Sequence, residues 1–320
     1  MSLMMSGLDC HRAGVALRET LAFSKDQAET LLNWLSRQPG VEGCVLLSTC
    51  NRTELYISGD PQCSPWQLLC RGANAPEQEL APFFTTRVGE DAALHLMEVA
   101  CGLHSQILGE DQIITQVRLS MERSQDCRTL DPTLAALFRH AVTAGKRAKT
   151  EVHLARGIPS MGTRCREILE RELQGLENKR VLVIGNGQMG RLAAEILQEA
   201  GAKVQVTLRT YRHGETVIPR GCGTVGYEDR LEALEGAHAL VSATTSPHYT
   251  FTKEQLLTLK NPPKVAVDLA VPRDIDPKCA DYLKLFDTDA LGTGGPGTPE
   301  EVSALKGETS KSAKGLRPGR

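Results

Sequence analysis

Three adjacent residues, Cys50, Asn51 and Arg52, carry side chains suited to covalent catalysis. They follow a short apolar run, residues 44–47, which predicts a buried strand ending just before them. A loop at a strand end places side chains at the mouth of a pocket rather than in the core. A neighbouring arginine favours the thiolate form of a cysteine and can also bind a carboxylate. We therefore interpret Cys50 as a candidate nucleophile, with a buried structural thiol as the alternative.

A second candidate site is the glycine-rich segment GNGQMG at 185–190. It lies between an apolar strand, residues 180–184, and an amphipathic helix that runs to Ala200, followed by a strand at 203–208. Strand, glycine turn, helix and strand form the context that a dinucleotide fingerprint requires. The predicted cofactor-binding residues are Gly185, Asn186, Gly187, Gln188, Met189 and Gly190. The alternative is a domain of the same shape that binds nothing.

The residues after the second of these strands favour NADPH over NADH. An NAD site carries an aspartate or glutamate at this place to bind the ribose hydroxyls. Here the segment reads LRTYR, with Arg209 and Arg212 and no acid. A guanidinium suits a 2′-phosphate, so Arg209 is a predicted cofactor ligand. In the alternative interpretation, both arginines are simply solvated.

Periodicity and turn signals predict an α/β protein with two domains. Expected elements in the first half are a helix capped by Ser24 and Gln27, strands at 43–47 and 53–57, helices at 90–102, 132–151 and 162–173, and a loop followed by a helix within 102–118. Further strands are expected at 239–243 and 264–269. We predict an N-terminal α+β catalytic domain (1–155), a linker helix (156–175), a Rossmann-like doubly wound domain (176–291) and a disordered tail (292–320).

Composition limits the class of protein. The 320 residues are 41% hydrophobic and 24% charged, with a net charge of −2, so no overall attraction to nucleic acid is expected. Any contact with nucleic acid would require a local basic surface, and residues 138–151 hold Arg139, His140, Lys146, Arg147 and Lys149. Such a helix either is a solvated face or follows an RNA backbone. Ten cysteines without a CxxC pair, no signal peptide and no apolar run of ~20 residues predict a cytoplasmic protein with reduced thiols and no membrane span.

Several strings, in collinear order, resemble glutamyl-tRNA reductase, the enzyme that begins tetrapyrrole (porphyrin) biosynthesis. They include LSTCNRTELY at 47–56, ALHLMEVACGLHSQILGEDQI at 93–113 and VDLAVPRDID at 267–276. The resemblance implies that Cys50 attacks the ester of glutamyl-tRNA to give a thioester. NADPH then reduces this thioester to glutamate-1-semialdehyde, with no metal involved. The glutamate-1-semialdehyde aminomutase is implied as a further partner.

The resemblance also implies roles for individual residues. His95 falls on the active-site histidine of the family. The substrate-binding positions are Thr49, Asn51, Arg52, Ser105, Glu110, Asp111, Gln112 and Gln116, with Arg52 holding the substrate carboxylate and Asp111 taking a place that is commonly proline. From the residues alone, His95 reads as a packed or surface histidine, and Glu110 and Gln112 as helix caps. Arg273 and Asp274 are expected to have a structural role at a domain junction.

Three departures from the family pattern affect the expectation. Cys10 stands where the family has a histidine, and His104 stands where it usually has an aspartate. Family members continue past Leu291 into a helical dimerisation domain, whereas this chain becomes rich in Gly, Pro, Ser and Lys. We therefore expect a monomer with weakened tRNA binding. Two alternative functions follow: an NADPH-dependent reductase of another acyl thioester, or a non-catalytic regulatory paralogue.

Overall fold

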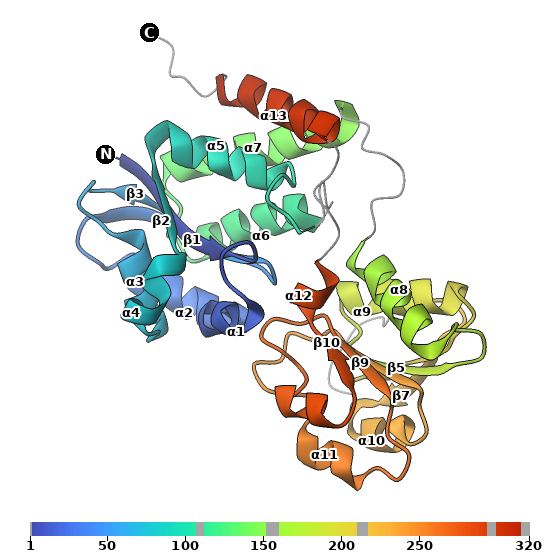
Figure 1. The fold of residues 1–320 in the computed structure, drawn as a ribbon. Helices are drawn as coiled ribbons and strands as arrows, with labels where there is room; N and C mark the ends of the chain where they lie inside the picture. The colour runs from blue at the N-terminus through green and yellow to red at the C-terminus, as the bar shows by residue number, and fades with distance from the viewer. Residues whose placement is uncertain (1, 107–111, 152–159, 210–216, 293–298, 315–320) are drawn as a thin grey trace. The chain divides into compact units, whose positions relative to one another are not determined.

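The chain folds into two compact units, shown in Figure 1. The computed structural model describes residues 2–106, 112–151, 160–209, 217–292 and 299–314. The first unit comprises residues 1–158 together with 294–320, and the second comprises residues 159–293. An antiparallel sheet in the first unit and a parallel sheet in the second confirm the predicted α/β class. None of the described helices is long and apolar enough to cross a membrane.

The first unit is built on a four-stranded antiparallel sheet in the order β2-β3-β1-β4. The strands are β1 (Ser2–Asp9), β2 (Val41–Ser48), β3 (Arg52–Gly59) and β4 (Thr85–Val88). The two strands predicted on either side of Cys50 are therefore present as β2 and β3. They pair as a hairpin in which Ser48 lies opposite Thr53. This register places Cys50 in the turn at the end of the hairpin.

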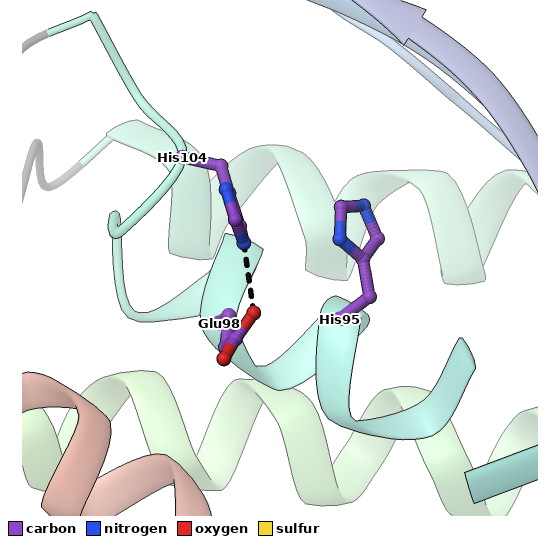
Figure 2. A group of neighbouring side chains, drawn as sticks. All are labelled: His95, Glu98 and His104. Carbon is purple, nitrogen blue, oxygen red and sulfur yellow. Dashed lines mark hydrogen bonds and ion pairs between the residues drawn. The ribbon is translucent and has the colours of Figure 1, made fainter. Parts of the chain in front are cut away.

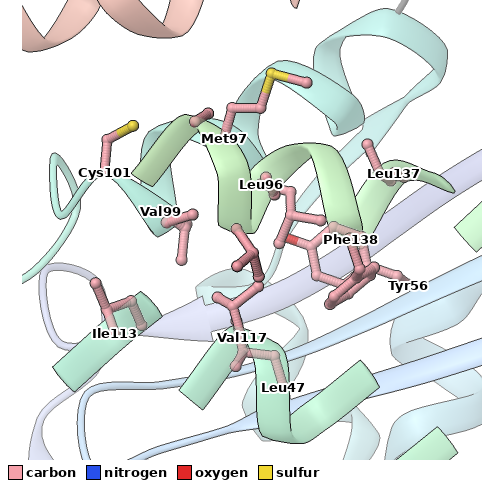
Figure 3. Close-up of a cluster of buried hydrophobic side chains, with 14 of the residues drawn as sticks. Leu47, Tyr56, Leu96, Met97, Val99, Cys101, Ile113, Val117, Leu137 and Phe138 are labelled. Carbon is pink, nitrogen blue, oxygen red and sulfur yellow. The ribbon is translucent and has the colours of Figure 1, made fainter. Parts of the chain in front are cut away.

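Helices cover both faces of this sheet. They are α1 (Val15–Arg18), α2 (Lys25–Leu35), α3 (Pro65–Ala73), α4 (Glu77–Leu80), α5 (Gly89–Ala100), α6 (Gln112–Asp126) and α7 (Pro132–Glu151). Side chains alternate along each strand, so the two faces form two separate cores. Leu47 and Tyr56 face α5, α6 and α7 (Figure 3), while Leu46 and Leu55 face α2 and α3. The predicted capping box of Ser24 and Gln27 opens α2.

A helix, α13 (Pro299–Lys314), occupies much of the segment that we predicted to be disordered. Figure 1 shows it (red) alongside α5 and α7, and it packs on both. Leu305 is only 1% exposed and belongs to the core of the first unit, with Val302 packed beside it. The prediction of disorder is thus wrong for 299–314. Its composition is poor in apolar residues, but two of them lie three positions apart on one helix face and cover an apolar surface.

The second unit is a six-stranded parallel sheet in the order β10-β9-β8-β5-β6-β7. Its strands are β5 (Arg180–Ile184), β6 (Lys203–Leu208), β7 (Gly223–Gly226), β8 (Ala239–Ser242), β9 (Val265–Asp268) and β10 (Lys284–Phe286). Numbered within the unit, this is the doubly wound order of dinucleotide-binding folds, with its switch point between β5 and β8. The predicted Rossmann-like architecture is confirmed.

The helices of the second unit are α8 (Met161–Leu173), α9 (Gln188–Glu199), α10 (Arg230–Leu234), α11 (Lys253–Thr258) and α12 (Thr288–Leu291). We predicted α8 as part of a linker between domains. It belongs to the second unit instead, because it packs on α9. At Gly162 the two helices are so close that a Cβ atom would lie 2.8 Å from Ile196.

Candidate active site

Hydrogen bonds to backbone groups fix the turn that carries Cys50. Thr49 Oγ1 accepts from the backbone N–H groups of Asn51 and Arg52, both at 3.2 Å. The backbone N–H of Thr49 donates to the carbonyl of Arg52 at 2.9 Å. From outside the turn, Arg18 Nε donates to the carbonyl of Cys50 at 3.2 Å. Cys50 is half-buried, so its thiol is held at the edge of the core by a rigid backbone.

A buried polar network lies next to this turn. Arg52 is 1% exposed, and its Nη1 donates to Glu54 Oε1 at 2.9 Å. The same oxygen contacts His95 Nε2 at 3.0 Å, and Glu54 Oε2 accepts from the hydroxyl of Tyr56 at 2.8 Å. Burial raises the pKa of Glu54, but the nearby charges of His95 and Arg52 outweigh it and hold this pKa well below its usual range. Glu54 is therefore an ionised group at the centre of the network.

A third group of side chains continues the network to the end of α5. His104 Nε2 lies 2.8 Å from Glu98 Oε2, and its ring stacks at a tilt on that of His95, with centroids 5.0 Å apart. Figure 2 shows the three side chains of His95, Glu98 and His104 gathered on one side of α5. The carbonyl of His104 accepts from Arg52 Nη2, so the turn after α5 is bound to β3.

Two buried atoms, one in the Cys50 turn and one in the Glu54 network, have no hydrogen-bond partner among the residues that the structure describes. They are Asn51 Oδ1 and His95 Nδ1. Buried polar atoms are nearly always paired, and those that are not commonly face a ligand or water. These two atoms are therefore candidate ligand contacts.

The second unit presents a glycine turn between β5 and α9 that fits a dinucleotide. Gly185 has a φ of +108°, which side-chain-bearing residues rarely adopt. A Cβ at Gly190 would lie 2.0 Å from the carbonyl oxygen of Gly185, whereas a Cβ at Gly187 would meet nothing within 4 Å. Space beside Gly187 leaves room for a pyrophosphate at the N-terminus of α9, and the buried Asn186 Oδ1 has no hydrogen-bond partner among the described residues. Gln188 and Met189 form the first turn of that helix.

Two arginines and a tyrosine meet beyond the end of β6. The guanidinium of Arg209 lies 4.7 Å from the ring centroid of Tyr227, and that of Arg230 lies 4.2 Å from the same centroid. Arg230 also donates to the carbonyl of Thr250 at 3.0 Å, while Arg209 is exposed. This is the place where a dinucleotide fold reads the adenosine ribose. The second arginine predicted here, Arg212, lies outside the described residues.

Each of the two units matches a known protein family. Residues 6–152 match the family model of the N-terminal domain of glutamyl-tRNAGlu reductase, and residues 167–293 match that of shikimate/quinate 5-dehydrogenase. The chain is 42% identical over 299 residues to the glutamyl-tRNA reductase of Acetivibrio thermocellus, covering 92% of this chain and 89% of that protein. The chain belongs to the glutamyl-tRNA reductase family. The members of this family are oxidoreductases, and the dehydrogenase-like second unit indicates a nicotinamide cofactor.

Other relatives differ in length. The probable multifunctional siroheme biosynthesis protein HemA of Ruminiclostridium josui is 41% identical over 92% of this chain, but the chain spans only 58% of that protein. Among solved structures, the glutamyl-tRNA reductase of Methanopyrus kandleri matches with 29% identity and a TM-score of 0.44, covering 98% of this chain and 77% of that one.

The structure brings several of the family-derived positions together. Thr49, Asn51 and Arg52 share the turn of Cys50, and His95 joins them through Glu54. Ser105 is buried directly after His104, while Gln112 and Gln116 lie half-buried on one face of α6. Glu110 and Asp111 lie outside the described residues. The roles of all these residues stay predictions.

Arg52 and Asp274 lie differently from our expectations. We expected the Arg52 side chain to line an open pocket, but both of its terminal nitrogens bind protein atoms, so its grip on a substrate carboxylate stays a prediction. Asp274 is fully buried and accepts from Ser242 Oγ at 2.8 Å and from the backbone N–H of Thr244 at 2.7 Å. Its observed role is to hold loops together inside the second unit.

Sequence reasoning missed three residues of the site: Arg18, Glu54 and Glu98. A usable signal existed for Glu54, because Arg52, Glu54 and Tyr56 alternate along one strand and so share a face. Three polar or ionisable side chains on the buried face of a strand indicate a polar network rather than a core. Arg18 gave no such signal, because only the fold brings α1 to the Cys50 turn.

Proposed function

We propose that this chain is an NADPH-dependent reductase that converts glutamyl-tRNA to glutamate-1-semialdehyde, the first step of tetrapyrrole biosynthesis. The observation that carries the proposal is the position of Cys50. It lies in a rigid hairpin turn beside a buried Arg52–Glu54–His95 network, in a chain whose second unit has a dinucleotide fold. Membership of the glutamyl-tRNA reductase family supports this substrate and this reaction.

In the first step, Cys50 acts as the nucleophile. Its thiolate sulfur attacks the carbonyl carbon of the ester between glutamate and the tRNA 3′ end. A carbon–sulfur bond forms, the carbon–oxygen ester bond breaks, and its electron pair leaves with the 3′ oxygen, which takes up a proton. We assign His95 the role of orienting or protonating this leaving group, with its ring held through Nε2 by Glu54.

In the second step, the thioester on Cys50 is reduced. The glycine turn at 185–190 would hold NADPH, which would supply the hydride for this reduction. The Cys50 thiolate then leaves, which releases the aldehyde and restores the nucleophile. A thioester suits this step because its carbonyl is more electrophilic than that of an ester and thiolate is a good leaving group.

The preference for NADPH rests on the arginine pair at the end of β6. Arg209 is exposed, Arg230 lies beside it over Tyr227, and the segment 208–209 offers no carboxylate for ribose hydroxyls. A cationic pair over an aromatic ring fits an adenosine that carries a 2′-phosphate. Arg230, which sequence reasoning did not identify, joins Arg209 in this proposal.

The basic face of α7 is the proposed contact for the RNA backbone. Arg139, His140, Lys146, Arg147 and Lys149 are all exposed on it, and Arg147 is paired with Glu151 at 3.3 Å. Binding through such a face falls steeply with salt. Docking of the aminomutase, a monomeric state and the cytosol as compartment stay predictions; sedimentation of the purified chain tests the second of them.

The decisive experiment is the Cys50→Ser variant, compared with Cys63→Ser as a control for another half-buried thiol in the same unit. We expect Cys50→Ser to form no semialdehyde from glutamyl-tRNA and NADPH, because a hydroxyl lacks the nucleophilicity of a thiolate. NADPH binding should be unchanged in both variants. Near-normal turnover by Cys50→Ser would exclude the covalent mechanism. If the wild type reduced another acyl thioester but not glutamyl-tRNA, the result would favour a reductase of that other substrate. If the wild type did not bind NADPH, the result would favour a non-catalytic regulatory paralogue.

A further inference from the structure

Three metal-ligating side chains converge at the C-terminal end of α5. His95, Glu98 and His104 each offer one nitrogen or oxygen atom, and these atoms lie within 4.8 Å of one another. His95 and Glu98 are three residues apart on one helix, so they share a face. His104 returns over that face from the turn that follows, as Figure 2 shows.

The ring of His95 is already oriented for a ligand. Its Nε2 lies 3.0 Å from Glu54 Oε1 and donates to that oxygen, so in the neutral imidazole that a metal requires the lone pair is on Nδ1. His95 is 5% exposed, and Nδ1 has no partner among the described residues. In Figure 2 the ring nitrogen next to the Cβ-bearing carbon, Nδ1, faces His104 and Glu98. A buried acceptor without a donor is costly, so this nitrogen indicates a missing ligand.

We infer that His95 Nδ1, a Glu98 carboxylate oxygen and His104 Nε2 form a binding site for a divalent transition metal of the zinc class. Two imidazoles and one carboxylate are a donor set that suits Zn²⁺ and its neighbours rather than Mg²⁺ or Ca²⁺. Glu54 completes the set as the carboxylate that holds the far nitrogen of a ligating histidine. Glu98 and His104 are 20% and 30% exposed, which leaves an opening for a fourth ligand such as water.

To bind a metal ion, the three ligand atoms, which lie within 4.8 Å of one another, need to move only slightly closer together. In a tetrahedral zinc site the ligand atoms lie about 3.3 Å apart. His104 Nε2 and Glu98 Oε2 are 2.8 Å apart, joined by a proton that a metal ion would replace. We assign the remaining movement to the His104 side chain, because His104 lies in the turn after α5 rather than in the helix. The neighbouring charges are those of Glu54, Arg52 and Arg87, of which Arg87 acts on Glu98.

The test is a titration of the full chain with ZnCl2, compared with Glu98→Gln, His104→Asn and the control His11→Asn, which removes an exposed histidine. All four proteins keep the ten cysteines, so zinc bound to thiols contributes equally to each. We expect one additional tight site in the wild type and in His11→Asn. In the other two variants its affinity should fall by more than about 100-fold, exceeding the loss typical of a changed outer contact.

Substitution of Co²⁺ gives a second measurement on the same proteins. The site should add d–d absorption without a thiolate charge-transfer band, and this signal should be missing from Glu98→Gln and His104→Asn. Tryptophan fluorescence verifies that these variants are folded. Equal zinc binding by the wild type and His104→Asn, or a cobalt spectrum of thiolate type alone, would overturn the inference. The inference does not rest on the proposed reductase activity, because binding is measured without substrate or NADPH.

Discussion

Glu54→Gln tests the buried network most directly. Glu54 is 1% exposed and its carboxylate is shared by Arg52, His95 and Tyr56. A glutamine can keep the shape: its Oε1 can still accept from Arg52 and His95, and its amide can donate to the Tyr56 oxygen. The substitution therefore removes the negative charge while leaving the contacts in place.

The expected loss of stability follows from the charge left behind. Arg52 remains buried, and the acceptors of its two terminal nitrogens among the described residues become the His104 carbonyl and a neutral amide. Removing one partner of a buried ion pair costs about 3–5 kcal/mol, and the retained hydrogen bonds place the expectation near the lower end. Tyr56→Phe is the matched control. It keeps every charge and loses one hydrogen bond to an ionised acceptor, worth about 1.5–3 kcal/mol.

The pH dependence separates charge from shape. The folded pKa of Glu54 is lowered, so its carboxylate stabilises the fold fully above its unfolded pKa of about 4.3. That stabilisation is lost as the pH falls from there toward the folded pKa. The difference in unfolding free energy between the wild type and Glu54→Gln should therefore be constant at neutral pH and shrink below about pH 4.

Urea unfolding followed by tryptophan fluorescence measures this difference in the relevant unit. The two tryptophans, Trp34 and Trp66, both lie in the first unit, so their signal follows the part of the chain that holds Glu54. Equal urea midpoints for the wild type and Glu54→Gln at pH 7 would refute the argument. So would a difference that stays constant down to pH 3.

Three further changes test other parts of the chain. Arg209→Ala should weaken NADPH about 10–100-fold while changing NADH little, since only NADPH has a phosphate to pair with it; fluorescence titration with both cofactors decides this. Leu305→Ala should destabilise the first unit by about 2–5 kcal/mol in urea, because Leu305 is 1% exposed, while the exposed Lys306→Ala should not; equal midpoints would show that α13 adds no stability. Burial and the charge of Asp274 raise the pKa of Asp268 to about 8, so the stability of the second unit should fall as the pH rises from about 4 to 8. Asp274→Asn should flatten that fall in calorimetry, because it removes the repulsion yet can still hydrogen-bond Thr244, and an unchanged slope would show that the two carboxyl groups are not coupled.

Local sequence signals were sufficient for the elements that carry the candidate chemistry. The apolar runs on either side of Cys50 and the glycine turn at 185–190 depend on residues close together in the chain. Strand alternation and backbone freedom at glycine are local properties, so β2, β3, β5 and α9 could be predicted. The family strings then predicted that His95 and Cys50 act in the same site, but they did not predict which side chains contact His95.

Only the tertiary structure decided which charges meet. The contacts of Glu54 with His95, of Arg52 with the His104 carbonyl and of Arg18 with the Cys50 carbonyl join residues that are 41, 52 and 32 positions apart. Such pairs depend on how the helices pack on the sheet, which no local pattern encodes. The same reason explains α13: the composition of 299–314 predicts disorder, but the apolar surface of α5 and α7 that Leu305 covers is formed elsewhere in the chain.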